Sequence, residues 1–153
     1  MVAALDAADA AGPSATDGCS QILNDVRGRI ALLDRGTCGF VVKVTNAQAA
    51  GARAVLVGDN VVALPPPGLG GSDPAITIPS GRISLADATA IRARLTAGEA
   101  VRARLLLDTS VVAGTDRVRR QVMLAALNPV SPGSSISHFE SVASPNLLIS
   151  RRR

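Results

Sequence analysis

The feature that most constrains this chain is a strand–turn–helix–strand pattern between residues 29 and 57. A short apolar run bounded by turn formers predicts a buried strand over residues 29–34. Apolar residues at helical spacing then predict a helix that begins at Phe40 and stops at Gly51. A second apolar run predicts a strand over residues 53–57. Two short strands joined by one helix are typical of a βαβ unit, in which the strands are parallel.

A third strand and a second helix are predicted further along the chain. Residues 75–79 form another short apolar run, which Pro79 ends because proline cannot donate to a ladder of hydrogen bonds. Ser84 stands three residues before Asp87, an acidic variant of the capping box. The helix predicted there is closed by Gly98 and has one apolar face, made by Leu85, Ala88, Ile91 and Leu95.

Two more strands complete the predicted architecture. Apolar and basic residues alternate over 101–107, which is the period of a half-exposed strand, and a further strand is predicted over 121–126. Five or more strands and two helices in mixed order predict an α+β fold. The chain has 153 residues, a length typical of one domain.

Composition argues against several functions. The chain has no Trp, no Tyr and two Phe, whereas base-stacking nucleic-acid modules need aromatic platforms. The net charge of +4 includes the terminal residues 151–153, and without them 13 basic residues face 12 acidic ones. No apolar run approaches the roughly 20 residues of a membrane span. One His and two Cys cannot complete a His/Cys zinc site within this chain. We therefore expect no nucleic-acid partner, no membrane span and no autonomous enzyme of a familiar kind.

The two cysteines, Cys19 and Cys38, have two interpretations from composition alone. In a reducing cytosol they would be two buried thiols. In a secreted protein they would form a disulfide that closes a loop of about 20 residues and contributes roughly 3 kcal/mol. Residues 1–5 lack the basic and long apolar regions of a signal peptide. The chain is then expected to be either cytosolic or a fragment of a longer secreted protein.

The segment over residues 58–73 is rich in proline and glycine and predicts a loop. It is either an exposed connector or a recognition loop, since surface loops held by a rigid scaffold often carry binding residues. Its glycines do not match a phosphate-binding pattern. The candidate binding residues in this loop are Pro66, Gly68, Leu69 and Gly70.

The residues from Gly28 to Val57 closely resemble the protease-associated (PA) domain. The family pattern is a strand, an Arg-Gly-x-Cys-x-Phe turn, a helix carrying Asn-Ala-Gln-x-Ala-Gly-Ala, and a second strand. The segment over 76–84 is similar to the family's Ile-Pro-x-x-x-Ile-Ser segment. The resemblance covers roughly residues 17–108. It implies a small β-barrel-like sandwich with two flanking helices, of the swivelling β/β/α type. The domain limits expected are 1–16 for an N-terminal loop or linker, 17–128 for the PA domain, and 129–153 for a C-terminal segment.

The resemblance also implies a non-catalytic binding role without a cofactor. PA domains bind substrates, shape access to active sites or hold domains together, so the expected partner is a protein or peptide, either a peptidase domain or its substrate. In plant sorting receptors the Arg-Gly-x-Cys turn lies at the cargo-binding surface. By this resemblance the candidate contacts are Arg35, Gly36, Thr37 and Cys38. Alternatively, Gly36 and Cys38 only shape the turn and Arg35 is solvated. The family's extracellular habit implies a Cys19–Cys38 disulfide and a secreted protein.

Residues 132–149 are similar to a segment of bacterial leishmanolysin-like zinc metallopeptidases that follows their inserted PA domain. His138 matches the third zinc-binding His of those enzymes, and Ile149 stands where their methionine turn has Met. The sequence has no His-Glu-x-x-His, so two ligands and the general base are missing. His138 is expected to hold zinc only weakly, with ligands from outside the chain. Besides a recognition module, the chain could be a fragment of such a peptidase or a purely structural spacer.

Overall fold

The computed structural model describes residues 1–63, 66–105 and 124–126. Within this part, four parallel strands form a sheet in the order β1-β2-β3-β4. Two further strands, β5 and β6, pair antiparallel in a separate sheet. The elements in chain order are β1 (Val2–Ala3), β2 (Ile30–Asp34), α1 (Phe40–Ala49), β3 (Ala54–Gly58), β4 (Ser80–Ile83), α2 (Leu85–Thr96), β5 (Ala103–Leu105) and β6 (Leu124–Ala126).

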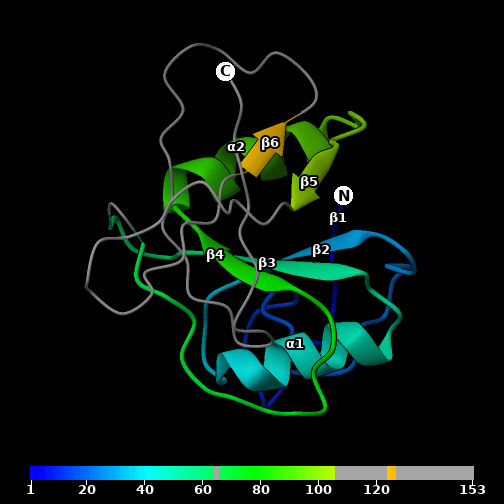
Figure 1. Ribbon diagram of the computed structural model, residues 1–153, viewed down its shortest axis with the longest axis vertical. Coiled ribbons are helices and arrows are strands. Elements are labelled where there is room, and N and C mark those ends of the chain that lie inside the picture. The colour runs from blue at the N-terminus through cyan, green and yellow to red at the C-terminus, as the bar shows by residue number, and fades with distance from the viewer. Residues whose placement is uncertain (64–65, 106–123, 127–153) are drawn as a thin grey trace, which may run out of the picture.

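The helices α1 and α2 cover opposite faces of the parallel sheet (Figure 1). Successive side chains of a strand point to opposite faces, and the two cores follow this alternation. On the α1 side the sheet contributes Ala31, Leu33, Val55 and Val57. On the α2 side it contributes Leu32, Leu56 and Ile83, which pack with Ala88. The central strands are buried on both faces, which explains their continuous apolar sequence.

The predicted βαβ unit is confirmed, with strand and helix bounds within one or two residues of those expected. β2 and β3 pair in parallel from Ile30 opposite Ala54 to Asp34 opposite Gly58. The capping box is also confirmed, since the Ser84 hydroxyl accepts a hydrogen bond from the backbone N–H of Asp87 at 3.1 Å. The α+β class with two flanking helices is therefore confirmed, and the predicted strands over 101–107 and 121–126 contain β5 and β6.

The predicted strand over residues 75–79 is wrong, because most of its backbone bonds to a side chain, and a bond to a neighbouring strand is made by the Pro79 carbonyl, which accepts from Val55 of β3. The Gln48 side chain on α1 accepts from the backbone N–H groups of Thr77 and Ile78 at 2.7 and 3.2 Å. Its amide donates to the Ala75 carbonyl at 2.9 Å. The segment passes the outside of α1 before it enters β4 (Figure 1). The strand of this region begins only at Ser80.

The expected linker over residues 1–16 is also wrong at its start. β1 pairs with β2 through Val2 opposite Ala31 and Ala3 opposite Leu32. The Ala4 side chain is fully buried in the core on the α1 side. A two-residue strand has no periodicity to detect, so the pattern gave no sign of it. The first residues belong to the domain. The expected boundary at residue 128 and the segment 129–153 lie outside the described residues.

Gly58 provides a test of the contact between the sheet and α2. A Cβ atom at Gly58 would lie 2.5 Å from the Ala88 Cβ, so Gly58→Ala forces the helix away from the strand. We expect a loss of about 1–3 kcal/mol in the free energy of unfolding, measured by urea denaturation. Gly70→Ala is the matched control, because nothing lies within 4 Å of a Cβ at that position. Equal unfolding midpoints for the two variants would contradict this packing.

Candidate functional site

The carboxyl ends of β2, β3 and β4 meet at one edge of the sheet, where a buried carboxylate joins them. Asp59, directly after β3, has a side chain with no exposed surface. Its Oδ2 accepts from Arg82 Nη2 at 2.6 Å, and its Oδ1 lies 3.3 Å from Arg35 Nη1. Arg35 Nη1 also donates to the Asn60 side-chain oxygen at 2.8 Å. Asp59 therefore links the residue after β2 to a residue within β4.

The ionised form of Asp59 is the stable one in this environment. Burial raises the pKa of the carboxyl. The hydrogen bond and charge of Arg82 lower it, as do the N–H groups of Val61 and Asn60, and the pKa lies below its ordinary value. Arg82 in turn packs over the Phe40 ring, with its guanidinium carbon 5.6 Å from the ring centroid. The pair is thus wedged between strand ends and the first residue of α1.

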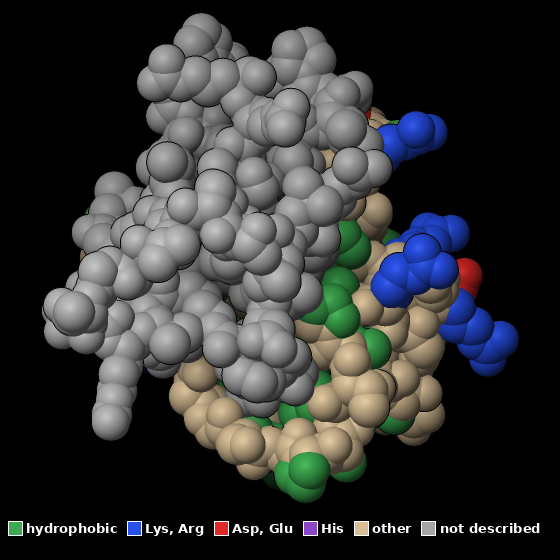
Figure 2. Space-filling view, in the orientation of Figure 1, with side chains coloured by type: hydrophobic (Ala, Val, Ile, Leu, Met, Phe, Trp, Pro, Cys, Tyr) green, Lys and Arg blue, Asp and Glu red, His purple; other side chains and the backbone are tan. Residues whose placement is uncertain are grey.

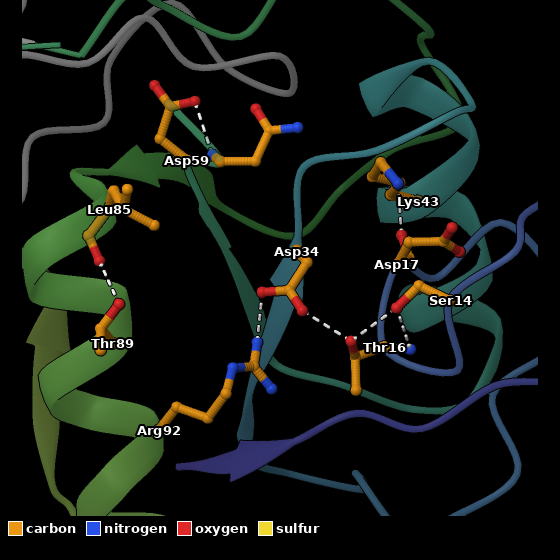
Figure 3. Close-up of polar contacts among 10 residues, drawn as sticks. Ser14, Thr16, Asp17, Asp34, Lys43, Asp59, Leu85, Thr89 and Arg92 are labelled. Atoms are coloured by element: carbon orange, nitrogen blue, oxygen red, sulfur yellow. Dashed lines mark hydrogen bonds and ion pairs between the residues drawn. The ribbon is translucent and has the colours of Figure 1, made fainter. Parts of the chain in front are cut away.

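A second ion pair borders an open hollow of about 520 Å³ at the same edge. Arg92 on α2 donates to Asp34 Oδ1 at 2.5 Å, and the Thr16 hydroxyl donates to Asp34 Oδ2 at 2.6 Å. Figure 3 shows these side chains reaching toward one another from α2, the end of β2 and the N-terminal segment. The hollow is lined by Asp34, Asp59, Leu85, Ala88, Thr89, Arg92, Ala93 and Thr96.

The turn over residues 35–39 is fastened to the N-terminal segment by the predicted disulfide. Cys19 and Cys38 are bonded, with 5.6 Å between their Cα atoms. Beneath the turn lies the buried Asp17, and a Cβ at Gly36 would lie 3.2 Å from the Asp17 Cβ. The disulfide pairing is therefore confirmed, and Gly36 has a steric reason to be glycine.

The loop after β3 packs against the first turn of α1, beside the turn over residues 35–39. Leu69 is buried in the core that also contacts Phe40 and Val41. Gly71 has φ +97°, and a Cβ there would lie 2.7 Å from Val41 Cγ2. The structure thus brings the two predicted binding segments together at the amino end of α1, although more than 25 residues separate them in sequence.

The predicted binding residues differ in how they are placed. Gly36, Thr37 and Gly70 are exposed, whereas Cys38 and Gly68 are half-buried. Pro66 and Leu69 are buried and support the loop from beneath. The Arg35 side chain is 38% exposed, but Asp59 and Asn60 hold its guanidinium group. The group is therefore not freely solvated. His138 lies outside the described residues.

Sequence reasoning missed the buried charges that hold the turn: Asp17, Lys43, Asp59 and Arg82. One signal was available, because Asp34 and Asp59 each stand at the end of an apolar run. Parallel strands end at the same sheet edge, so two such carboxylates are expected to be neighbours. The burial of Lys43 had a second signal. It is the one lysine of the chain, and it lies four residues before Ala47, on the same face of the predicted helix.

No group of three or more His, Cys, Asp or Glu in the described ranges could hold a metal ion. No helix in those ranges is long and apolar enough to span a bilayer. On the face seen in Figure 2, basic side chains project at intervals along one edge and do not merge into a continuous basic surface. The geometry of the described part is that of a rigid scaffold presenting a turn and a loop.

The comparisons with known proteins agree with this architecture. The chain matches the PA domain family over residues 2–91 and belongs to that family. The resemblance to the PA domain seen in the sequence is therefore confirmed, and the PA domain is a non-catalytic accessory domain. The match begins at residue 2 and thus includes β1.

The chain is similar to parts of much longer proteins. It is 51% identical over 53 residues to Vacuolar-sorting receptor 7 of Arabidopsis thaliana, covering 31% of this chain and 8% of the receptor. It is 39% identical over 89 residues to Probable leucine aminopeptidase 2 of Aspergillus fumigatus, covering 57% and 18%. It is 43% identical over 58 residues to an Aminopeptidase of Pseudomonas aeruginosa, covering 37% and 11%. The chain spans less than a fifth of the length of these relatives. Such relatives, with the disulfide, point to an extracellular or lumenal compartment.

Asp59→Asn tests the buried carboxylate. Because it leaves Arg82 buried without its counter-charge, we expect a loss of about 3 kcal/mol at neutral pH. The folded-state pKa of Asp59 is depressed, so its contribution is full above the unfolded value of about 3.9. The contribution is lost as pH falls through the folded value. The stability difference between wild type and variant should therefore shrink in acid.

The measurement is urea unfolding of both proteins from about pH 7 down to about pH 2. Asp25→Asn is the matched control, since Asp25 is exposed and accepts one hydrogen bond from the Arg27 backbone. A difference between wild type and Asp59→Asn that stays constant down to the lowest pH would contradict the ion-pair account.

Proposed function

We propose that this chain is a protein-recognition module that binds a protein or peptide segment at the amino end of α1. The turn–loop surface consists of the exposed residues Gly36, Thr37, Gly39, Pro67 and Gly70. The observation that carries the proposal is the meeting of the 35–39 turn and the 66–71 loop at Phe40 and Val41. Each segment is anchored from beneath and exposed above.

Rigidity supports a binding role for this surface. The disulfide and the Asp59 contacts fix the turn, and the buried Leu69 fixes the loop. A surface ordered before it binds loses less conformational entropy when a partner docks. The prolines in the loop restrict its backbone further. Binding can then be specific although the surface is small.

The amino end of α1 offers hydrogen-bond donors to a partner. Gly39 is the N-cap, and no side chain among the described residues caps the helix there. The first turn contains no acidic residue, so the positive end of the helix dipole is not neutralised within the helix. Backbone N–H groups at such an end favour carboxylate or carbonyl oxygens. A peptide backbone or acidic side chain suits this end.

Exposed apolar side chains lie next in the chain to the residues that hold Arg35. Val61 is 47% exposed and Val62 84% exposed, directly after Asp59 and Asn60. Val42, in the first turn of α1, is 43% exposed. Apolar contacts combined with backbone donors suit an extended peptide with at least one apolar side chain.

The relatives support a peptidase domain or its substrate as the partner, since their names are those of aminopeptidases and sorting receptors. The proposed setting is a secreted protein. The similarity of residues 132–149 to leishmanolysin-like metallopeptidases stays a prediction, as does a weak zinc contact at His138. A structural spacer is the alternative role, and it requires no ligand at the turn–loop surface.

The test uses peptides selected from a random-sequence phage library on the immobilised full chain. Thr37→Glu places a carboxylate and extra bulk on the turn, and we expect it to weaken binding of a selected peptide at least tenfold, or about 1.4 kcal/mol. Fluorescence anisotropy of the labelled peptide measures the affinity. Thr45→Glu makes the same change at an exposed position in the middle of α1 and should leave affinity unchanged.

Urea unfolding of both variants shows whether each remains folded. If Thr37→Glu folds and binds the selected peptide as tightly as wild type, the turn–loop surface is not the binding site. If no peptide is selected and a natural partner also binds Thr37→Glu normally, the spacer role is favoured.

Peptidase activity is a separate expectation. A catalytic zinc usually needs three protein ligands and an open position for water, and the sequence contains a single His. The purified chain should therefore not cleave casein, with or without added zinc. Zinc-dependent cleavage that disappears in His138→Ala would contradict the non-catalytic assignment.

A further inference from the structure

Two hydrogen-bond donors converge on one sulfur of the disulfide. Lys43 Nζ lies 3.4 Å from Cys19 Sγ, and the backbone N–H of Cys38 donates to the same sulfur at 3.2 Å. Cys19 is 6% exposed and Lys43 has no exposed surface, whereas Cys38 is half-buried in a surface turn. The two cysteines therefore differ: Cys19 is buried with its sulfur among donors, and Cys38 is the more exposed residue.

The burial of the Lys43 ammonium group costs free energy, and particular acceptors surround it. Burying an ammonium group is unfavourable unless it is paired, and burial lowers the pKa of Lys43. The Asp17 carbonyl accepts from its Nζ, and Figure 3 shows Lys43 extending from α1 to Asp17. The carboxylates of Asp17, Asp6 and Asp34 oppose the effect of burial on the Lys43 pKa. These acidic groups favour the ammonium form of Lys43 beside the disulfide.

The contact with sulfur gains strength only if the sulfur becomes negative. A disulfide sulfur is a weak acceptor, so the 3.4 Å contact contributes little while the bond is intact. A thiolate beside an ammonium and a backbone N–H is stabilised by both, as in the low-pKa thiols of exchange sites. The geometry therefore suits the product of disulfide opening better than the disulfide itself.

We propose that Cys38 is a site of S-thiolation by low-molecular-weight thiols, with Cys19 as the leaving thiolate. The thiolate of the incoming thiol forms a bond to Cys38 Sγ, and the bond between Cys38 and Cys19 breaks. The electron pair of that bond goes to Cys19 Sγ, beside Lys43. The incoming thiol is oxidised to a mixed disulfide as Cys19 is reduced. Return of the Cys19 thiolate onto Cys38 reverses the step and expels the incoming thiol.

Both the exposure of the cysteines and the stability of the leaving thiolate favour attack at the sulfur of Cys38. Exchange is faster when the departing thiol has a lower pKa and when the attacked sulfur is accessible. Cys38 is followed by Gly39, where a Cβ would meet nothing within 4 Å, and Thr37 before it is exposed. The inference concerns covalent chemistry and holds whatever the turn–loop surface binds.

The first test locates the adduct in the oxidised full chain. The protein is incubated briefly with reduced glutathione, quenched in acid and alkylated with N-ethylmaleimide. Trypsin separates the two cysteines because Arg27, Arg29 and Arg35 lie between them, and mass spectrometry then identifies each label. We expect glutathione on Cys38 in at least about tenfold excess over Cys19. Equal labelling, or an excess on Cys19, overturns the proposal.

The second test measures the Cys19 thiol directly in Cys38→Ser. Its pKa, followed by the ultraviolet absorbance of the thiolate, should lie below the ordinary value of about 8.5. Adding Lys43→Met should raise that pKa by about one unit or more, whereas adding Arg53→Met, at an exposed position before β3, should not change it. A Cys19 pKa at or above the ordinary value in Cys38→Ser overturns the proposal even if Lys43→Met fails to fold.

Discussion

The buried carboxylate of Asp59 is the interaction on which the arrangement of the sheet edge depends. β2, β3 and β4 are parallel neighbours, and at this edge the backbone N–H groups of Arg35 and Asp59 donate to the carbonyls of Gly58 and Ile83. Asp59 continues the connection past that point, because its two oxygens contact Arg35 and Arg82. Arg82 also contacts the ring of Phe40, so the start of α1 is positioned by the same group. A single side chain thus fixes three strand ends and the helix that follows the turn.

The buried charged side chains of this domain share one role, which is to orient the loops. Lys43, Asp17, Asp59 and Arg82 are all buried. Asp59 pairs with Arg82, 23 positions away, and Lys43 donates to the backbone carbonyl of Asp17, 26 positions away. Isolated buried charges are expensive, whereas paired ones fix geometry at modest net cost. The apolar cores hold the helices on the sheet without specifying how the loops are oriented. These polar contacts supply that orientation, which a binding surface made of a turn and a loop requires.

Much of the fold could be predicted from local sequence patterns. The features that could not be predicted depend on contacts between residues that are distant in the sequence. The apolar runs before Asp34 and around Val55 carry the signal of buried strands, and Ser84 and Asp87 mark a helix start. The run at residues 75–79 has the same local signal, but Gln48 on α1 takes its hydrogen bonds. β1 is too short to show a period.

The candidate site was predictable in position but not in detail. The motif around Arg35 and the proline-rich loop were identified separately, and pattern alone does not show that Gly71 rests on Val41. Nor does it show that Arg35 is held by Asp59, because the two residues are 24 positions apart. Burial of Leu69 and Pro66 likewise depends on how the loop folds back. Residue type and spacing locate a surface, and tertiary contacts decide which of its residues face outward.

The disulfide has a mechanical consequence when the domain is pulled from its two ends. Cys19 and Cys38 close a covalent ring 19 residues apart, and that ring contains β2. Tension applied through the two ends of the chain can bypass the ring by passing from Cys19 to Cys38 across the sulfur bridge. β1, held by two register pairs, lies outside the ring and would bear such a load first. The central strand is thereby shielded from extension, and the turn that follows it keeps its shape under load.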